Sequence, residues 1–322
     1  MSGFFVCEYR GERLAGFDDV TDGDGEAPRL YAAGPRQVLA ALADGTPGHE
    51  AAAERGWRSV RLPAGAGREL RMRPALFPEH PGDALVGGFM QTHNVKSGAT
   101  SGGAPAAAGP GQPTWFFKGT GTSLRTTGDP LTVPATAVAV CEEAEVVLVH
   151  IDDEEGTPRY AGYTFGNDLT DIGLFRRHAG HLGYAKLCDA AVSPWFFPGP
   201  PPASVTGRVL VLRDGATAYQ GGFTTGSDAL AFTLDTMVGH LAGYPALHHP
   251  GRVHYTFLGA DRSSFHHGFT ITDGDTVVLD VTSHRVTLVN PVRWSPPAAA
   301  AAPASTAVPA AVPAAPPTAG AR

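Results

Sequence analysis

The chain has 322 residues, among them 41 glycines and 28 prolines, and its formal net charge is −7 at pH 7. This acidic balance argues against a nucleic-acid backbone or an anionic membrane surface as the main partner. No uncharged apolar run approaches the roughly 18 residues that a membrane-spanning helix needs. Residues 1–16 carry charges of both signs and no apolar signal core, so we expect a cytoplasmic protein.

Residues 1–80 indicate a small N-terminal α/β domain. Residues 4–6 and 57–62 favour strands, because apolar and β-branched residues dominate the first and alternate with polar ones in the second. Residues 34–42 favour a helix, since Pro35 stands in the first turn and apolar residues follow at helical spacing.

Two stretches of low complexity interrupt the chain. Residues 97–113 are rich in glycine and alanine, and they fit a flexible loop or an active-site lid equally well. Residues 295–322 are rich in alanine and proline, which excludes a regular helix and leaves little to pack into a core. We expect a disordered tail there.

From residue 115 onward, short apolar runs alternate with turn signals, which predicts a mainly β domain with few helices. We expect two strands within 133–149 and single strands at 160–169, 207–213, 254–258 and 276–281. The turn Asp273-Gly274-Asp275 stands between 269–271 and 277–279, and this arrangement predicts a hairpin. Residues 229–241 predict a helix.

Carboxylates gather where two of these strands would meet. Glu143 and Glu145 begin an apolar strand, and alternation places both side chains on one face, with Glu142 on the other face and solvated. The next strand ends at Asp168, within reach of that pair. Like charges at close range repel unless a cation lies between them, and an all-oxygen set favours Mg²⁺ or Mn²⁺.

Lys186 follows Asp168 by 18 residues and completes this cluster. Three carboxylates, one divalent cation and the Lys186 ammonium sum to no net charge. A neutral site of this kind suits the binding of an anionic acid or enolate.

Two cysteines and two pairs of histidines are also candidates for chemistry, but we expect them to have structural roles. Cys141 and Cys188 are interpreted as small buried residues rather than catalytic thiols. The histidine pairs 248–249 and 266–267 are interpreted as exposed loop residues, although they are possible metal ligands.

These motifs, in this order, resemble the fumarylacetoacetate hydrolase superfamily. Glu-x-Glu at 143–145 opens an apolar strand, and Gly-Tyr-Thr-x-Gly-Asn-Asp follows at 162–168. Lys186 and Val-Ser-Pro-Trp at 192–195 come next, and the resemblance covers residues 85–293. Some pieces are similar to the hydrolases of the superfamily and others to its 2-keto-3-deoxy sugar-acid dehydratases.

The resemblance implies an α+β, mainly β fold, with a fumarylacetoacetate-hydrolase-like β-roll as the catalytic domain and a homodimer as the assembly. It implies that the carboxylates hold Mg²⁺ (or Mn²⁺), which chelates a 2-oxo acid or β-dicarbonyl substrate. It further implies roles for individual residues: metal ligation by Glu143, Glu145 and Asp168, catalysis by His93 and Lys186, and substrate contact by Lys118, Gly259 and Ala260.

Two departures from the superfamily's pattern concern the reaction. Its hydrolases pair the water-activating histidine with a glutamate, but Lys96 stands three residues after His93, and no glutamate follows Glu155. Asp261 is a possible substitute. The glycine–threonine pair that commonly meets the substrate carboxylate is Gly259-Ala260 in this chain, so a hydroxyl donor is missing.

Three functions therefore remain open. The first is Mg²⁺-dependent hydrolysis of a C–C bond in an acylpyruvate or β-dicarbonyl acid. The second is a lyase that dehydrates or decarboxylates a 2-oxo acid at the same metal, with specialised metabolism as one setting for it. The third is a non-catalytic homologue, which the intact carboxylates and Lys186 disfavour.

Overall fold

The computed structural model describes residues 3–17, 29–34, 37–38, 40–41, 48–63, 66–94 and 112–297. Lys96, most of the 97–113 stretch and the tail beyond residue 297 lie outside the described residues. The described part of the chain contains no helix long and apolar enough to cross a membrane.

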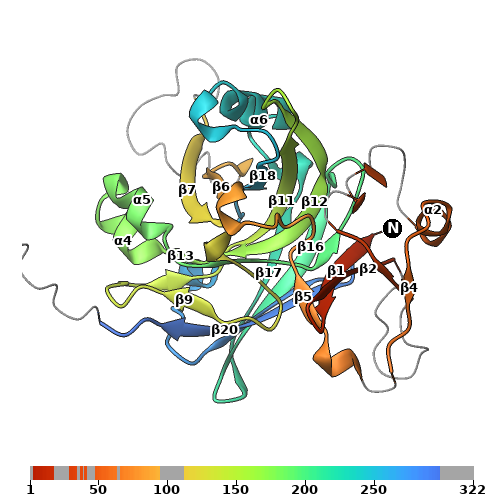
Figure 1. Cartoon of the computed structure of the whole chain (residues 1–322). Coiled ribbons are helices and arrows are strands. Elements are labelled where there is room, and N and C mark those ends of the chain that lie inside the picture. The colour runs from red at the N-terminus through yellow and green to blue at the C-terminus, as the bar shows by residue number, and fades with distance from the viewer. Residues whose placement is uncertain are drawn as a thin grey trace, which may run out of the picture.

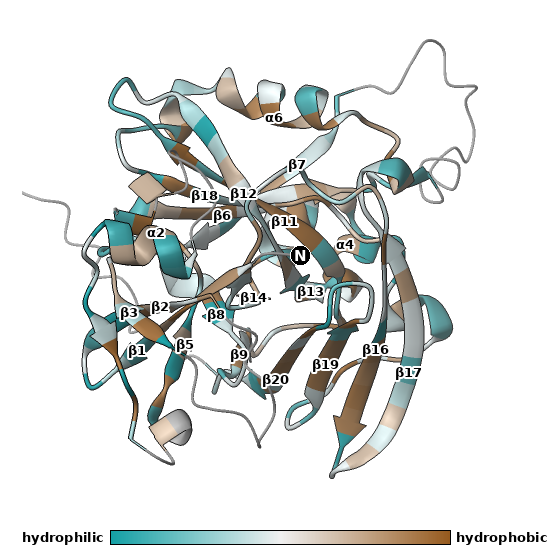
Figure 2. Ribbon diagram, turned by 90° about the vertical axis from the view of Figure 1, so that its right-hand side faces the viewer, coloured by the Kyte–Doolittle hydropathy of each residue, from teal (hydrophilic) through white to brown (hydrophobic). Residues whose placement is uncertain are grey.

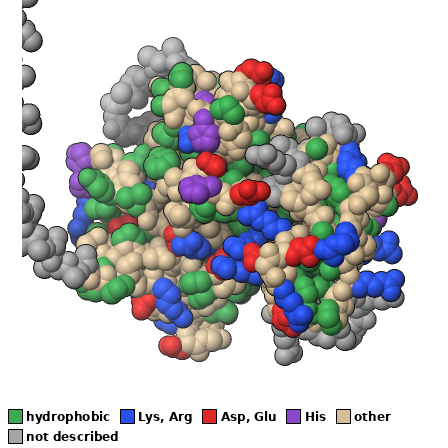
Figure 3. Space-filling view, viewed as in Figure 1, with side chains coloured by type: hydrophobic (Ala, Val, Ile, Leu, Met, Phe, Trp, Pro, Cys, Tyr) green, Lys and Arg blue, Asp and Glu red, His purple; other side chains and the backbone are tan. Residues whose placement is uncertain are grey.

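A six-stranded sheet forms the N-terminal unit, on the right-hand side of Figure 1 in red and orange. Its strands are β1 (Phe4–Tyr9), β2 (Glu12–Gly16), β3 (Leu30–Ala32), β4 (Ser59–Val60), β5 (Arg71–Arg73) and β15 (Trp195–Phe196). Because β15 pairs with β1 in antiparallel register, a segment from the second half of the chain completes this sheet. Acidic and basic side chains alternate on its outer surface (Figure 3), and ion pairs such as Arg73–Glu8 join them.

A seven-stranded sheet lies at the centre of the molecule, in the order β7-β6-β18-β11-β12-β14-β8. Its strands are β6 (Ala84–Met90), β7 (Thr114–Thr120), β8 (Leu124–Thr126), β11 (Ala144–Asp152), β12 (Pro158–Asp168), β14 (Ala190–Val192) and β18 (Val253–Phe257).

A five-stranded sheet packs against it, in the order β17-β16-β19-β20-β9. Its strands are β9 (Leu131–Val133), β16 (Val205–Arg213), β17 (Ala216–Thr225), β19 (Thr276–Val281) and β20 (Val286–Trp294). The short strands β10 (Val140–Cys141) and β13 (Thr170–Asp171) form a separate pair.

The helices are short and lie around the sheets. The α-helices are α2 (His49–Glu54), α4 (Ile172–Arg177), α5 (Leu182–Ala185) and α6 (Leu234–Ala242). The 3₁₀ turns are η1 (Ala66–Glu69), η2 (Pro81–Asp83), η3 (Gly121–Ser123), η4 (Ala179–His181), η5 (Ser227–Ala229), η6 (Pro245–Leu247) and η7 (Ser264–His267).

Strand β11 is buried on both faces, which explains its continuous apolar sequence. Val146 and Leu148 face the core between the two large sheets, whereas Val147 and Val149 face the core shared with the N-terminal unit. Figure 2 shows brown, apolar residues along β11, β16 and β19, where these layers meet. A strand covered on both sides holds its side chains rigidly, and the carboxylates lie at its start.

Most of the expected strands are confirmed. The segments at 160–169, 207–213, 254–258 and 276–281 coincide with β12, β16, β18 and β19 within two residues. The expected strand at 57–62 is reduced to β4, and α6 begins at Leu234, five residues later than expected and directly after its N-cap Thr233. Residues 37, 38, 40 and 41 of the expected 34–42 helix are helical, and the rest of that segment lies outside the described residues or is not helical.

The hairpin expected around Asp273-Gly274-Asp275 is wrong. These residues do form a turn, but both edges of β19 are taken by β16 and β20. Ile271 instead bridges to Val140. The sequence correctly predicted the turn, which depends on neighbouring residues. It did not predict which strands pair with β19, because that depends on the arrangement of the whole sheet.

Candidate metal centre and active site

Three buried carboxylates meet where β11 begins and β12 ends. The two strands pair antiparallel with Glu145 opposite Gly166, so the start of one strand lies beside the end of the other. One oxygen from each of Glu143, Glu145 and Asp168 lies within 4.8 Å of the other two. The structure thus brings together the three residues that the sequence nominated as metal ligands.

Glu145 is held by backbone rather than by a cationic side chain. The N–H of Gly259 donates to Glu145 Oε2 at 2.6 Å. Gly259 has φ +92°, a conformation that favours glycine, and a side chain there would overlap Thr92 Oγ1. Thr92 in turn donates its hydroxyl to Leu258 O at 2.6 Å. The other oxygen, Glu145 Oε1, is buried without a hydrogen-bond partner among the described residues.

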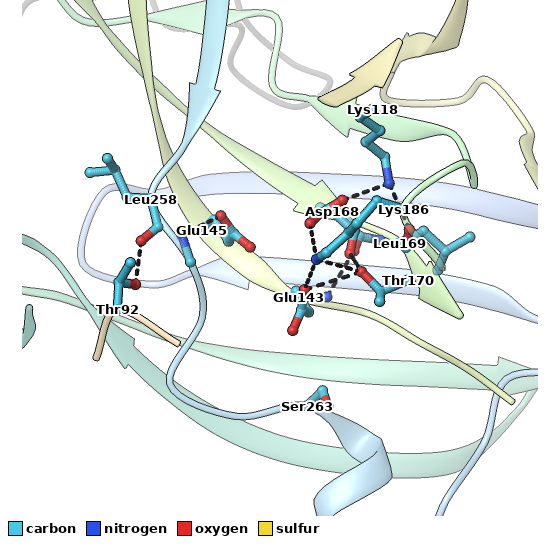
Figure 4. A network of polar contacts seen from close by, with 12 residues as sticks. Thr92, Lys118, Glu143, Glu145, Asp168, Leu169, Thr170, Lys186, Leu258 and Ser263 are labelled. Atoms are coloured by element: carbon cyan, nitrogen blue, oxygen red, sulfur yellow. Dashed lines mark hydrogen bonds and ion pairs between the residues drawn. The ribbon is translucent and has the colours of Figure 1, made fainter. Parts of the chain in front are cut away.

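Two fully buried lysines approach Asp168 from different elements (Figure 4). Lys186 Nζ contacts Glu143 Oε2 at 2.6 Å and also Asp168 Oδ2. Lys118, from β7, places Nζ 2.6 Å from Asp168 Oδ1 and donates to Leu169 O at 2.7 Å. Lys118 was nominated as a substrate contact, and the structure places it on a carboxylate of the cluster.

Thr170 and Asn167 belong to the network and escaped the sequence analysis. Thr170 donates its hydroxyl toward Glu143 Oε2 at 3.1 Å and accepts from Lys186 Nζ at 2.8 Å. The side-chain carbonyl of Asn167 accepts the Glu143 N–H at 3.2 Å. Asn167 directly precedes Asp168, and Thr170 follows it by two residues. This proximity in sequence could have identified both, because residues next to a metal ligand often hydrogen-bond to the ligands and orient them.

Burial and mutual repulsion dominate the electrostatics. The pKa of Glu145 lies well above its usual value because the carboxyl is buried and because Asp168 and Glu143 add negative charge nearby. Burial by itself would lower the pKa of Lys186, but the charges of Asp168, Glu143 and Glu145 outweigh burial and raise it. Lys186 therefore stays protonated and partly offsets the acidic charge.

The donor set fits a hard divalent cation. The three candidate ligands are all carboxylates, and an all-oxygen set of this kind favours Mg²⁺ or Mn²⁺ over Zn²⁺. Glu145 Oε1 is a buried oxygen that still needs a positive partner. Glu143, Glu145 and Asp168 are therefore placed where they could hold such a cation.

Glu142 differs from expectation. Its side chain leaves the cluster, as strand alternation predicts, but it is buried rather than solvated. The backbone N–H and the hydroxyl of Ser264 donate to its two oxygens at 2.8 and 2.6 Å. Burial raises the pKa of Glu142 to about 7. The correction arises because η7, distant in sequence, covers that face of the strand end.

His93 is buried close to the residues that support Glu145. Its Nε2 lies 3.0 Å from the Thr225 hydroxyl, and its Nδ1 lies 3.3 Å from the Thr92 hydroxyl. Thr92 also packs against Gly259, so His93 and Glu145 are linked through one threonine. The ring nitrogen of His93 that carries the proton is the one whose threonine partner accepts its hydrogen bond.

The remaining nominated residues are placed nearby. Ala260 is buried next to Gly259. Asp261 Oδ2 accepts from Thr224 N and Thr224 Oγ1, both at 3.2 Å, and from Arg262 Nε at 2.9 Å. Cys141 and Cys188 are buried as expected, and burial raises the pKa of the Cys188 thiol to about 12. A thiol with so high a pKa is a poor nucleophile.

No protein-family model matches the chain, and no curated protein matches it in sequence. Solved structures match over almost its whole length. A 2-keto-3-deoxy-D-arabinonate dehydratase complexed with magnesium and 2,5-dioxopentanoate has a TM-score of 0.62 at 16% identity, covering 91% of this chain and 99% of its own.

Two isomerase structures match to a similar extent. A 5-carboxymethyl-2-hydroxymuconate delta-isomerase from Mycobacterium smegmatis has a TM-score of 0.59 at 19% identity and covers 91% of this chain and 100% of its own. A 2-hydroxyhepta-2,4-diene-1,7-dioate isomerase from Mycobacterium marinum has a TM-score of 0.61 at 18% identity, with coverages of 92% and 99%. These neighbours belong to the fumarylacetoacetate hydrolase superfamily, so the chain has the fold that its motifs predicted.

Proposed function

We propose that this protein is a Mg²⁺-dependent lyase that dehydrates or decarboxylates a 2-oxo acid. The observation that carries the proposal is the buried carboxylate trio, with one oxygen of Glu145 unpartnered, beside two buried lysines. The dehydratase neighbour, described with magnesium and 2,5-dioxopentanoate, supports the same choice of metal and substrate class.

The charge of the site supports an anionic substrate. Three carboxylates and the ammonium groups of Lys118 and Lys186 leave one net negative charge, and a bound divalent cation reverses it to one net positive charge. With Lys186 as the only cationic side chain, as the sequence predicted, the loaded site would be neutral. Lys118 supplies the difference, so the loaded site favours the carboxylate of a 2-oxo acid.

A divalent cation held by the three carboxylates supplies Lewis-acid polarisation of a substrate's oxygens. The protein's own residues prepare the place. The Gly259 N–H fixes the orientation of Glu145, and Thr170 fixes that of Glu143. Lys186 brings a positive charge to a fully buried position, where negative charge developing on a substrate is stabilised more strongly than in water.

C–C bond hydrolysis, which the sequence analysis ranked first, is the second candidate. One observation favours it: His93 is buried and linked to Glu145 through Thr92, which is a suitable position for a proton-transfer group. However, the superfamily's hydrolases pair this histidine with a glutamate, whereas Lys96 stands three residues after His93, and the dehydratase neighbour supports a lyase. We therefore place hydrolysis second.

Turnover in ¹⁸O-labelled water separates the two reactions. The untagged protein with Mg²⁺ is incubated with 2-keto-3-deoxy sugar acids and with acylpyruvates, and products are identified by mass spectrometry. We expect one dehydrated or decarboxylated product without label in a newly formed carboxylate. Two cleaved fragments, with label in the newly formed carboxylate of one of them, would establish hydrolysis and reject the lyase. Lack of turnover with every substrate would favour a non-catalytic homologue.

The His93→Ala variant sharpens this test. A lyase is expected to lose about 10²-fold in turnover, the contribution of one proton-transfer group, whereas a hydrolase is expected to lose all measurable turnover. A homodimer and a cytoplasmic location remain predictions from the sequence, and sedimentation velocity tests the former.

A further inference from the structure

A second cluster of metal-ligating side chains lies at the other end of β11. Asp152 ends this strand, His254 lies in the neighbouring β18, and His248 lies in the loop before β18. Glu145 and Asp152 are seven residues apart along the strand, about 23 Å. The cluster is therefore separate from the carboxylate centre.

Both histidines approach the same carboxylate oxygen. His254 Nε2 lies 2.9 Å and His248 Nδ1 lies 3.1 Å from Asp152 Oδ1. One ligand atom from each of the three residues lies within 4.8 Å of the other two. The Asp152 side chain is completely buried, and the two imidazoles are each 8% exposed. Three segments of the chain thus contribute side chains to one buried cluster.

Both ring nitrogens of His248 face hydrogen-bond acceptors. Its Nδ1 faces the Asp152 carboxylate, and its Nε2 faces the backbone carbonyl of Leu241 at 3.2 Å. Both partners only accept hydrogen bonds, but a neutral imidazole carries a single N–H. In a neutral His248 ring, the nitrogen without a proton would therefore point its lone pair at an acceptor oxygen. A second proton or a bound metal ion removes this repulsion.

The surroundings resemble the outer shell of a metal site. Metal-bound histidines usually donate their other N–H to a backbone carbonyl or a carboxylate, as His248 is placed to do toward Leu241. The backbone N–H of His249 donates to Asp152 Oδ2 at 3.0 Å and orients the carboxylate. His150 is directly opposite His254 in the sheet register and brings a third imidazole to this end of β11.

We propose that Asp152, His248 and His254 form a second, structural metal site for a divalent transition cation of the Zn²⁺ type. Two imidazoles and one carboxylate are a donor set that Zn²⁺ binds readily and that Mg²⁺ does not prefer. The bound cation would fasten the loop between α6 and β18 to the edge of the central strands.

Because the proposed site lies far from the carboxylate centre, we expect metal binding there to affect the stability of the protein more than its turnover. A ligand that binds only the folded state raises the stability of that state, and the gain grows with the logarithm of the ligand concentration above its Kd. We therefore expect Zn²⁺ to raise the melting temperature of the untagged protein and to leave the Mg²⁺ dependence of turnover unchanged.

Cobalt titration provides the direct test, because Co²⁺ bound by imidazole has characteristic visible absorption. The titration is made on the untagged full chain with Mg²⁺ in excess, so that the carboxylate centre is blocked. His248→Ala and His254→Ala are compared with His249→Ala, an adjacent histidine whose side chain is 39% exposed. Circular dichroism of each variant verifies folding.

We expect one Co²⁺ per chain in the wild type and in His249→Ala, and at least about tenfold weaker binding in the two ligand variants. Glu145→Gln, which alters the other centre, should keep the Co²⁺ signal. Absence of Co²⁺ binding by the wild type, or equal binding by all variants, would overturn the proposal and assign the positive charge at His248 to a proton.

Discussion

Replacing Gly259 by alanine tests whether backbone geometry positions the Glu145 ligand. An added Cβ would overlap Thr92 Oγ1 and lie 3.1 Å from Phe89 O. Thr92 is fully buried, and its hydroxyl already donates to Leu258 O. The threonine therefore has little room to move, and the peptide that carries the Gly259 N–H must shift instead.

The expected cost has two parts. An alanine at φ +92° carries backbone strain of about 1–2 kcal/mol. Forcing an extra methyl group into a packed interior adds about 1–3 kcal/mol. Together they predict a loss of about 2–5 kcal/mol in the free energy of unfolding. Displacing the N–H from Glu145 Oε2 removes a supporting bond of a metal ligand, which typically weakens metal affinity by about 10–100-fold.

Gly128→Ala is the matched control. Gly128 has φ +87°, but nothing lies within 4 Å of an added Cβ, so this variant carries backbone strain without overlap. Urea unfolding should show Gly259→Ala to be less stable than Gly128→Ala by about 1–3 kcal/mol. Calorimetric titration should show weakened Mg²⁺ binding in Gly259→Ala alone. Equal stability and equal Mg²⁺ affinity in both variants would refute the reasoning.

Three further predictions concern single side chains. Glu145→Gln removes an anionic ligand and should weaken Mg²⁺ binding at least about tenfold by titration calorimetry, and an unchanged affinity would contradict the assignment. Arg213→Met leaves the buried carboxyl of Asp275 without its ion pair and should lower the free energy of unfolding by about 1–3 kcal/mol. Arg208→Met removes the exposed ion pair with Asp280 and should lower it by less than about 1 kcal/mol. Equal losses for the two variants in urea unfolding would contradict this prediction. Burial lowers the pKa of His284 from 6.5, so the unfolded chain binds its proton first and stability falls as pH falls below about 6.5. His284→Asn should lose less stability between pH 7.5 and 5 in urea unfolding, and identical losses would exclude His284 as a cause.

The sequence by itself determined much of the central sheet and its carboxylates. Short apolar runs bounded by turn signals are a property of neighbouring residues, so the run after Glu145 and the run ending at Asp168 could be assigned to strands before any contact was known. The short turn between them required antiparallel pairing, and that pairing brings the first strand's start beside the second strand's end. The gathering of Glu143, Glu145 and Asp168 was therefore predictable.

Tertiary structure alone decided which distant groups meet these residues. Lys118 reaches Asp168 from β7, the Gly259 N–H reaches Glu145, and Ser264 buries Glu142, across separations of 50 to 122 residues. The cluster of Asp152 with His248 and His254 likewise joins residues about one hundred positions apart. Local patterns carry no record of such contacts, because strand order and sheet packing depend on how the whole chain buries its apolar surface.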